Sequence, residues 1–225
     1  MITAIVLAAG ESKRMGQPKM LLPWGESTVL GRVLAVLRAA EVDDILVVTG
    51  GAREQVEAVA RANGARTVFN ADYARSEMLG SIQTGLRNLT LPPPPLRGTS
   101  PKSEIGIPVR KPNKAIGFGG GREGVDAALL VLGDQPQVEE SSVRAVLTAY
   151  RKSVSNLVVP SYRMRRGHPW LVARPLWDEI LRMKSPHTPR DFLTARAAGI
   201  EYVNLDTPTI LADLDTPEDY LNSRP

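Results

Sequence analysis

Small and basic residues gather between residues 7 and 19, directly after a short apolar run. The small residues at 8–10 and Gly16 let backbone N–H groups approach an anion closely, as they do in phosphate-binding loops. Arg14 and Lys19 add two positive charges to the same segment. The position after an expected strand favours a phosphate-binding loop over a plain surface turn. The segment contains neither the Gly-x4-Gly-Lys-Ser/Thr motif nor the Gly-x-Gly-x2-Gly motif.

Two groups of carboxylates are candidates for metal binding. Asp134 follows residues 127–132, the most apolar run of the sequence, and is a predicted Mg²⁺ ligand. Mg²⁺ is commonly bound by one or two carboxylates, together with substrate phosphate oxygens and water. A turn or a helix N-cap is the alternative role for this aspartate. Residues 216–219 (Thr-Pro-Glu-Asp) indicate a helix start, which leaves Asp213 and Asp215 free to complete the metal site.

A phosphate-binding loop combined with two separated carboxylates indicates phosphoryl or nucleotidyl transfer. In such reactions, charge neutralisation and alignment of the reacting groups supply most of the catalysis. No general base is needed when the attacking group is itself a phosphate. The sequence agrees with this chemistry, because it contains only two histidines.

Apolar runs and amphipathic stretches alternate along the chain and must position these residues. We expect strands at residues 3–7, 45–49, 67–69, 127–132 and 157–159, and helices at 28–39, 53–63, 81–88 and 141–153. Because the expected strands are continuously apolar, the sequence predicts a mainly parallel sheet with helices on both faces, in one α/β domain over residues 1–225. Ligands of such sheets lie at the carboxyl ends of the strands, which is where the loop and Asp134 fall.

The charge of the chain is concentrated in one segment. The 225 residues include 28 Lys plus Arg and 24 Asp plus Glu, which gives a net charge of +4. Residues 89–124 contain seven Pro, seven Gly, six Lys or Arg and two Glu, so this segment alone carries +4. We expect it to be a disordered insertion, because its composition cannot bury enough apolar surface to fold. The rest of the chain is neutral overall, and we expect no nucleic-acid partner.

The sequence has no cysteine, which excludes a disulfide scaffold, a thiolate nucleophile and a Cys-ligated metal. No apolar run approaches the roughly 20 residues that span a membrane. The first residues, Met1-Ile2-Thr3, do not have the basic start of a signal peptide. We therefore expect a cytoplasmic protein without a membrane partner.

Four motifs occur in an order that resembles a known enzyme family. They are Leu-Ala-Ala-Gly-x-Ser-x-Arg-Met-Gly-x-x-Lys at 7–19, Gly-Asp-Gln-Pro at 133–136, Arg-Gly-His-Pro at 166–169 and Asp-x-Asp-Thr-Pro-Glu-Asp-Tyr at 213–220. The chain resembles the molybdenum cofactor cytidylyltransferase-like branch of the nucleoside-triphosphate transferases, over nearly its whole length except residues 89–124. The resemblance implies a three-layer, Rossmann-like fold of the nucleotide-diphospho-sugar transferase type. It also implies Mg²⁺-dependent transfer of CMP from CTP to molybdopterin, with release of pyrophosphate.

The resemblance also implies a role for each matching residue. Arg14, Lys19 and Asp134 would be catalytic, and Asp134 and Asp215 would hold Mg²⁺. The nucleotide would contact Leu7, Ala8, Ala9, Gly10, Arg14, Lys19, Ser81 and Asp134. Relatives that transfer a guanylyl group have Ala-Gly-Gly at 8–10, so Ala-Ala-Gly here favours cytidine. The family's base-facing Gly-Met-Ser-Ser-Ser run corresponds to residues 77–81, of which only Met78 and Ser81 match.

Arg166, His168 and Arg190 are the residues that the resemblance assigns to the acceptor. The segment 162–169 is expected to form a hairpin or loop over the cleft, where its arginines meet the phosphate of the pterin. A solvated basic turn with a locally bonded histidine is the alternative. A molybdoenzyme or its chaperone is a further expected partner.

Two other functions are open at this point. The chain could be a nucleotidyltransferase or glycosyltransferase that acts on another acceptor, such as a sugar phosphate. It could also be a non-catalytic protein that binds and delivers the cofactor, with the insertion as a docking arm. The catalytic set Arg14, Lys19 and Asp134 argues against the non-catalytic alternative, because a binding protein does not need it.

Overall fold

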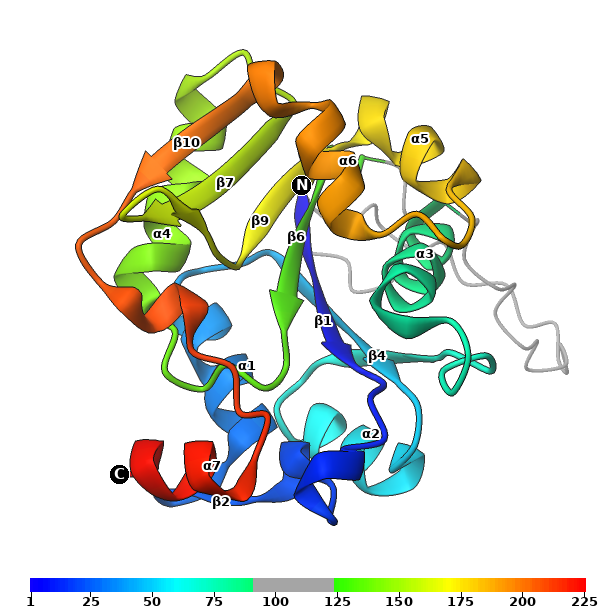
Figure 1. Ribbon diagram of the computed structural model, residues 1–225, viewed down its shortest axis with the longest axis vertical. Coiled ribbons are helices and arrows are strands. Elements are labelled where there is room, and N and C mark those ends of the chain that lie inside the picture. The colour runs from blue at the N-terminus through cyan, green and yellow to red at the C-terminus, as the bar shows by residue number, and fades with distance from the viewer. Residues whose placement is uncertain (91–123) are drawn as a thin grey trace, which may run out of the picture.

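One eight-stranded sheet organises the part of the chain that the structure describes. The structure, a computed structural model, describes residues 1–90 and 124–225. The strand order is β10-β7-β9-β6-β1-β4-β5, with β8 paired to β7 (Figure 1). The strands are β1 (Ile2–Ala8), β4 (Asp44–Thr49), β5 (Arg66–Phe69), β6 (Ala127–Leu132), β7 (Leu157–Tyr162), β8 (Arg165–Arg166), β9 (Trp170–Ala173) and β10 (Ile200–Asn204), and β2 (Pro23–Trp24) and β3 (Ser27–Thr28) form a separate hairpin.

Helices cover both faces of the sheet (Figure 1). One face carries α1 (Val29–Ala39), α2 (Arg53–Ala62) and α4 (Glu140–Lys152), and the other carries α3 (Glu77–Thr90), α5 (Trp177–Arg182) and α6 (Pro189–Ala195). Successive side chains of β1 point to opposite faces of the sheet. Ala4 and Val6 belong to the core beneath α1, α2 and α4, and Ile5 and Leu7 belong to the second core, beneath α3, α5 and α6. The three-layer α/β architecture predicted from the sequence is therefore confirmed. None of the helices in the described residues is long and apolar enough to cross a membrane.

The arrangement of the strands places a topological switch point between β1 and β6, where the chain changes from one side of β1 to the other. Strands β1, β4 and β5 follow one another outward in parallel on one side, and β6 lies parallel to β1 on the other side. Beyond β6, strand β9 runs antiparallel to both β6 and β7, while β10 is parallel to β7. Ligands of open α/β sheets bind outside the carboxyl ends of strands at such a switch point. Residues 8–10 and Gly133 lie directly at that position.

Helix caps follow the predicted residue types. Thr28 begins α1 and its side chain accepts a hydrogen bond from the backbone N–H of Gly31. Thr216 begins α7 (Pro217–Ser223) and forms a reciprocal capping box with Asp219. The structural explanation for residues 216–219 is thus confirmed, and Asp219 is occupied by the cap.

The start of the insertion differs from the prediction. Helix α3 begins at Glu77, four residues before the predicted start, and continues to Thr90. Leu89 is buried in the second core, so residues 89–90 belong to the helix rather than to the insertion. Residues 91–123, which make up most of the segment expected to be disordered, lie outside the described residues.

A third, small apolar cluster joins the beginning of the chain to its last described segment. Met15, Leu22, Trp24, Val29 and Leu214 form this cluster, with Tyr220 packed against it. The Tyr220 hydroxyl also donates a hydrogen bond to the carbonyl oxygen of Pro23 at 2.6 Å. The loop that carries the predicted phosphate-binding residues is therefore anchored by the segment that carries the late aspartates.

Candidate functional site

The loop after β1 is held in a tight conformation beside a small cavity. Residues 13–15 form a short 3-10 turn, and both Ser12 and Gly16 have positive φ angles, of 54° and 67°. The Ser12 hydroxyl accepts a hydrogen bond from the backbone N–H of Lys19 at 3.0 Å, which closes the loop. Residues 10–15, Lys19 and Asp215 line a cavity of about 240 Å³ beside this loop. The loop thus presents two predicted phosphate ligands, Arg14 and Lys19, to one small open space.

Two basic and two acidic residues meet at the carboxyl ends of β1 and β6. The ammonium group of Lys19 contacts the carboxylate of Asp134 directly and lies 3.3 Å from Oδ1 of Asp215. Nη2 of Arg14 lies 3.1 Å from Oδ2 of Asp215. Burial disfavours the charged form of Lys19, but its interactions with the two carboxylates outweigh the effect of burial. The pKa of Lys19 is therefore raised. The structure therefore brings together Arg14, Lys19, Asp134 and Asp215, which lie far apart in the sequence.

The two carboxylates suit a hard divalent cation. Asp134 and Asp215 both contact one positive charge, the ammonium of Lys19, so they face a common point. No group of three or more His, Cys, Asp or Glu residues suited to a metal occurs within residues 1–90 and 124–225. Two carboxylates with phosphate oxygens and water are an ordinary Mg²⁺ environment, so the residues fit a cation that is completed by a bound triphosphate.

The segment 213–215 is fixed to the residues that follow β6. The backbone N–H of Leu214 donates to the carbonyl oxygen of Asp134 at 3.1 Å. The side-chain Nε2 of Gln135 donates to Oδ1 of Asp213 at 2.5 Å and to the carbonyl oxygen of Ile210 at 3.4 Å. Burial raises the pKa of Asp213, and the charges of the two neighbouring aspartates raise it further. Asp213 is therefore a structural partner of Gln135, which leaves Asp134 and Asp215 as the pair that faces Lys19.

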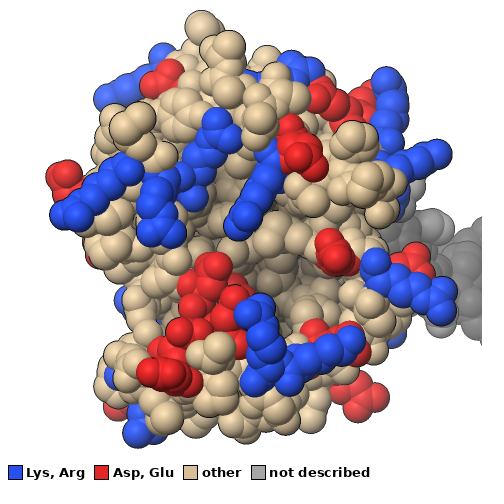
Figure 2. Space-filling view, viewed as in Figure 1, with Lys and Arg blue, Asp and Glu red and all other residues tan. Residues whose placement is uncertain are grey.

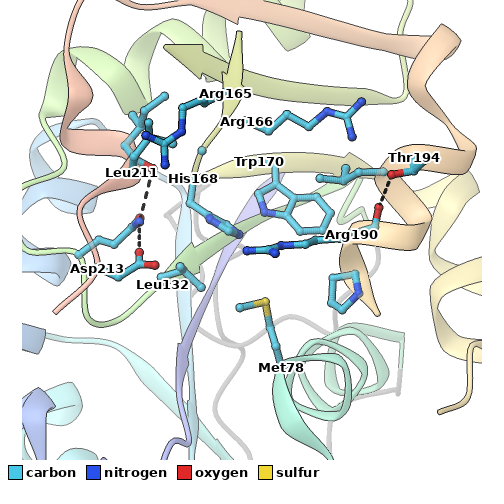
Figure 3. A pocket seen from close by; sticks show the side chains of 15 residues that line it. Met78, Leu132, Arg165, Arg166, His168, Trp170, Arg190, Thr194, Leu211 and Asp213 are labelled. Atoms are coloured by element: carbon cyan, nitrogen blue, oxygen red, sulfur yellow. Dashed lines mark hydrogen bonds between the residues drawn. The ribbon is translucent and has the colours of Figure 1, made fainter. Parts of the chain in front are cut away.

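A second, larger cavity lies on the other side of this acidic segment. Its volume is about 510 Å³, and its lining includes Arg165, Arg166, His168, Trp170, Arg190 and Asp213. Basic side chains gather along the upper side of the hollow in the face shown in Figure 2, and acidic side chains lie below it. In Figure 3, the side chains of His168, Trp170 and Arg190 converge in the middle of the cavity. The three residues predicted to bind the acceptor, Arg166, His168 and Arg190, thus line one cavity.

The hairpin that carries Arg166 is confirmed, because β8 pairs antiparallel with β7. The guanidinium of Arg166 donates to the hydroxyl of Tyr202 through Nε at 3.0 Å and Nη2 at 2.7 Å. Gly167 follows, and a Cβ atom at this position would lie 2.4 Å from the carbonyl oxygen of Ile210. Glycine is therefore required for the hairpin to lie against residues 208–211 and form the wall of the cavity.

His168 is neutral in this environment. Burial, together with the positive charge of Arg190, lowers its pKa to about 3. Its backbone N–H donates to the carbonyl oxygen of Ile210 at 3.0 Å. His168 as a residue is partly exposed, but its Nε2 is fully enclosed. His168 therefore offers hydrogen bonding rather than charge, and the positive charge of the cavity comes from the arginines.

The remaining predicted nucleotide residues lie in two different places. Leu7, Ala8 and Ala9 are buried, and the carbonyl oxygen of Leu7 accepts from the backbone N–H of Gly133 at 3.0 Å. Their side chains pack inside the fold, and of this group only Gly10 lines the small cavity. Ser81 is buried in α3, where its hydroxyl accepts from Asn70 and donates to the carbonyl oxygen of Glu77. Ser81 lines neither of the two cavities.

Trp170 and Gln135 line the larger cavity although neither is among the predicted binding residues. Gln135 is part of the Gly-Asp-Gln-Pro motif, so the motif could have indicated that this residue lies at the site. Trp170 is the first residue after Arg-Gly-His-Pro, but an aromatic residue at a strand start gives no local indication that it lines a cavity.

Comparisons with known proteins show what the chain is similar to. The model of the MobA-like NTP transferase domain matches residues 4–200. The molybdenum cofactor cytidylyltransferase of Escherichia coli (strain K12) is 24% identical over 226 residues, which is 99% of this chain and 95% of that protein. The molybdenum cofactor guanylyltransferase of Xanthomonas euvesicatoria is 47% identical over 45 residues, but this match covers only 20% of this chain and 24% of that protein.

A solved structure is similar over nearly the whole chain. Rv0371c from Mycobacterium tuberculosis H37Rv superposes with a TM-score of 0.72 at 26% identity, and the match covers 98% of this chain and 96% of that chain. The complex of the same protein with manganese superposes with a TM-score of 0.66, with the same identity and coverage.

Proposed function

Because the chain belongs to the family of MobA-like NTP transferase domains, we propose that it transfers CMP from CTP to molybdopterin and releases pyrophosphate. One observation carries the proposal: the cations of the loop after β1 and the Asp134–Asp215 pair meet between two cavities. The smaller cavity suits a triphosphate, and the larger cavity suits a bulky acceptor with an anionic group. The acidic segment 213–215 contributes Asp213 to one cavity and Asp215 to the other.

On the nucleotide side, Arg14 and Lys19 neutralise charge that builds up on the α-phosphate and on the leaving pyrophosphate. Asp134 and Asp215 would hold a divalent cation, Mg²⁺ in this proposal, which when bound neutralises further charge on the triphosphate. Lys19 is paired with both carboxylates. Binding of the triphosphate gives its ammonium group a phosphate partner in place of a carboxylate.

On the acceptor side, a terminal phosphate oxygen attacks the α-phosphorus, and the bond from this phosphorus to the pyrophosphate oxygen breaks. Arg166 and Arg190 provide the positive charge that holds the acceptor phosphate. His168, being neutral, orients the acceptor by hydrogen bonding. A phosphate nucleophile is already ionised, so no residue has to remove a proton from it.

Cytidine is the proposed base. The Ala-Ala-Gly sequence at 8–10 and the full-length match to the cytidylyltransferase of Escherichia coli support this choice. The short match to a guanylyltransferase makes GTP the alternative to compare. A molybdoenzyme or its chaperone, in a reducing cytoplasm, would be the recipient of the product.

Pyrophosphate release tests the proposal. We expect release with Mg²⁺, CTP and molybdopterin, and a loss of at least about a hundredfold in Asp134→Ala, since a metal ligand stabilises several kcal/mol of transition-state charge. Asp178→Ala removes an exposed carboxylate of α5 and is the matched control, with unchanged activity expected. Retained activity in Asp134→Ala would contradict the metal assignment. A preference for GTP would contradict the assignment of cytidine as the base. Turnover with a sugar phosphate in place of molybdopterin would contradict the assignment of the acceptor.

A further inference from the structure

A third cavity lies between α3 and the segment that joins α5 to α6 (Figure 1). This α3 cavity has a volume of about 530 Å³. Residues 75–77, 79, 80 and 83 line it on one side, and residues 183–187 line it on the other. It shares no lining residue with the two cavities of the candidate site. An occupant of the α3 cavity would therefore bind outside the site to which the triphosphate and the acceptor are assigned.

A free hydrogen-bond acceptor lies in the wall of the α3 cavity. Gln83 is 9% exposed, and its Nε2 donates to the carbonyl oxygens of Ile180 and Met183, each at 2.9 Å. A flipped amide would place an oxygen against both carbonyl oxygens, so the remaining atom is the acceptor Oε1. This oxygen has no hydrogen-bond partner among the described residues, yet it is not one of their fully enclosed unpaired atoms. Oε1 therefore opens onto the cavity that Gln83 lines.

The exposed part of the lining carries more positive than negative charge. Arg75 and Lys184 are exposed, and neither side chain pairs with another residue in the described part of the chain. Glu77 is the one carboxylate among the described residues that line the cavity. Because Arg75 and Lys184 are long and unpaired, their charged ends can close on an anion. The cavity thus offers positive charge at its solvent-exposed side and an uncharged acceptor at its buried side.

Apolar side chains make up much of the remaining lining. They come from both walls, namely Leu79 from α3 and Met183 and Pro186 from the opposite segment. Leu79 is 9% exposed, so this part of the wall is also buried. The volume is within the range of small-molecule sites, which combine an apolar lining with a few polar groups that fix orientation. Since buried polar groups are almost always paired, the free Oε1 of Gln83 indicates that the occupant donates a hydrogen bond.

We propose that the α3 cavity binds a small organic anion with an apolar body and with an uncharged N–H or O–H donor at the end opposite its charge. The donor pairs with Oε1 of Gln83, and the anionic group pairs with Arg75 and Lys184. The apolar body lies against Leu79 and Met183. The proposal goes beyond the proposed function and does not depend on it, because none of the residues assigned to the triphosphate, the cation or the acceptor lines this cavity.

Calorimetric titration with para-aminobenzoate tests the proposal. This compound has a carboxylate at one end of an apolar ring and an amino donor at the other. Benzoate lacks the donor and should bind about fivefold more weakly. We expect para-nitrobenzoate, which places an acceptor against Oε1 of Gln83, to bind at least about tenfold more weakly. A loss of the same size is expected for para-aminobenzamide, which lacks the charge. Equal binding of all four compounds, or no binding of para-aminobenzoate, would overturn the proposal.

Variants locate the bound compound. Combined Arg75→Gln and Lys184→Gln substitutions should weaken the binding of para-aminobenzoate at least about tenfold. Arg87→Gln is the matched control, because Arg87 is an exposed arginine of α3 that does not line the cavity, and it should leave the affinity unchanged. Unchanged affinity in the combined variant would overturn the proposal. Weaker binding in Arg166→Gln would also overturn it, by placing the anion in the larger cavity.

The role of Gln83 has a separate measurement. Gln83→Met removes the acceptor, so this variant should bind para-aminobenzoate and benzoate with equal affinity, whereas Arg87→Gln should keep the wild-type ratio of the two affinities. A glutamine that only joins α3 to the end of α5 would leave this ratio unchanged, and that result would overturn the proposal. The comparison of compounds uses the wild-type protein alone, so the proposal can be refuted even when Gln83→Met does not fold.

Discussion

Replacing Lys19 with methionine should destabilise the protein when divalent cations are removed and should make its stability respond strongly to added Mg²⁺. Lys19 is 13% exposed and is the positive charge that Asp134 and Asp215 share. Methionine keeps most of the aliphatic length of the side chain but removes the positive charge between the two carboxylates, and Asp215 then keeps only its contact with the more exposed Arg14 among the described residues. Their repulsion then opposes the folded state, and a divalent cation that relieves it binds to the folded state alone.

The size of the effect follows from the geometry. Two unit charges 3.3 Å apart, the distance from Lys19 to Asp215, attract by about 5 kcal/mol at an effective dielectric constant of about 20. The cost of burying the lysine offsets much of this attraction, and Asp215, at 40% exposed, is screened by solvent. A net loss of about 1 to 2 kcal/mol remains, which lowers the melting temperature of a chain of this length by about 2 to 8 °C. Mg²⁺ at ten times its dissociation constant restores about 1.4 kcal/mol.

Thermal melts in EDTA and in increasing MgCl₂ measure both effects. The variant should melt below the wild type in EDTA and gain more from a given Mg²⁺ concentration, because in the wild type the cation must displace the ammonium group. Lys13→Met is the matched control, since Lys13 lies in the same loop but is 76% exposed and pairs only with Glu11 among the described residues. The control should show neither effect. If Lys19→Met melts at the wild-type temperature in EDTA and responds to Mg²⁺ no more than the wild type, the assignment of Asp134 and Asp215 as a cation-binding pair is wrong.

Two further predictions concern the anchoring of the loop and the protonation of His168. Leu214 is 1% exposed, so Leu214→Ala should lower the free energy of unfolding in urea by about 2 to 4 kcal/mol and raise the KM for CTP, because the loop after β1 loses its anchor. Leu221→Ala, at 58% exposed, should change neither quantity. His168 has a pKa of about 3 when folded and about 6.5 when unfolded, so the unfolded state binds more protons between these values and stability falls as the pH is lowered through that range. Between pH 7 and pH 5 the wild type should therefore lose about 2 kcal/mol more than His168→Gln. His187→Gln, in an exposed loop, should behave as the wild type, and equal losses in wild type and His168→Gln would show that His168 is not held neutral.

Five strands (β1, β4, β5, β6 and β7) and the loops after them could be predicted, because each depends on a contiguous stretch of sequence. The run 127–132 is apolar throughout, and the structure buries every residue of it. The loop after β1 and the turn after β6 follow directly from the positions of these strands. Residue type and position after a strand were therefore enough to expect the loop and Asp134 at the carboxyl ends of the strands.

Features that depend on packing between distant segments were not predictable in this way. Gly80 and Gly85 weaken a helix prediction locally, yet α3 runs through both. A Cβ at position 80 would lie 2.1 Å from the side chain of Ser76, and one at position 85 would lie 2.5 Å from that of Ile5. Gly85 therefore allows α3 to approach β1, and Gly80 leaves room for the side chain of Ser76 before the helix. Only the folded structure shows why they are there.

The larger cavity illustrates the same limit. Gln135 and Asp213 are 78 positions apart, and their hydrogen bond sets which atom of the glutamine is free. Trp170 resembles any buried aromatic residue at the start of a strand. That its N–H has no hydrogen-bond partner among the described residues depends on the position of every neighbouring group, which no local pattern contains.

The contacts between the beginning of the chain and its last described segment have a consequence for protein synthesis. Arg14 and its partner Asp215 are 201 positions apart, and the hydrogen bond from Tyr220 to Pro23 spans 197 positions. At about 5 to 20 residues per second, a ribosome needs about 10 to 40 s to synthesise the intervening residues. During this time the nascent loop has its basic residues but neither Asp215 nor the Leu214 anchor. A nascent chain therefore cannot complete the charge pairs of the site until Asp215 has been synthesised.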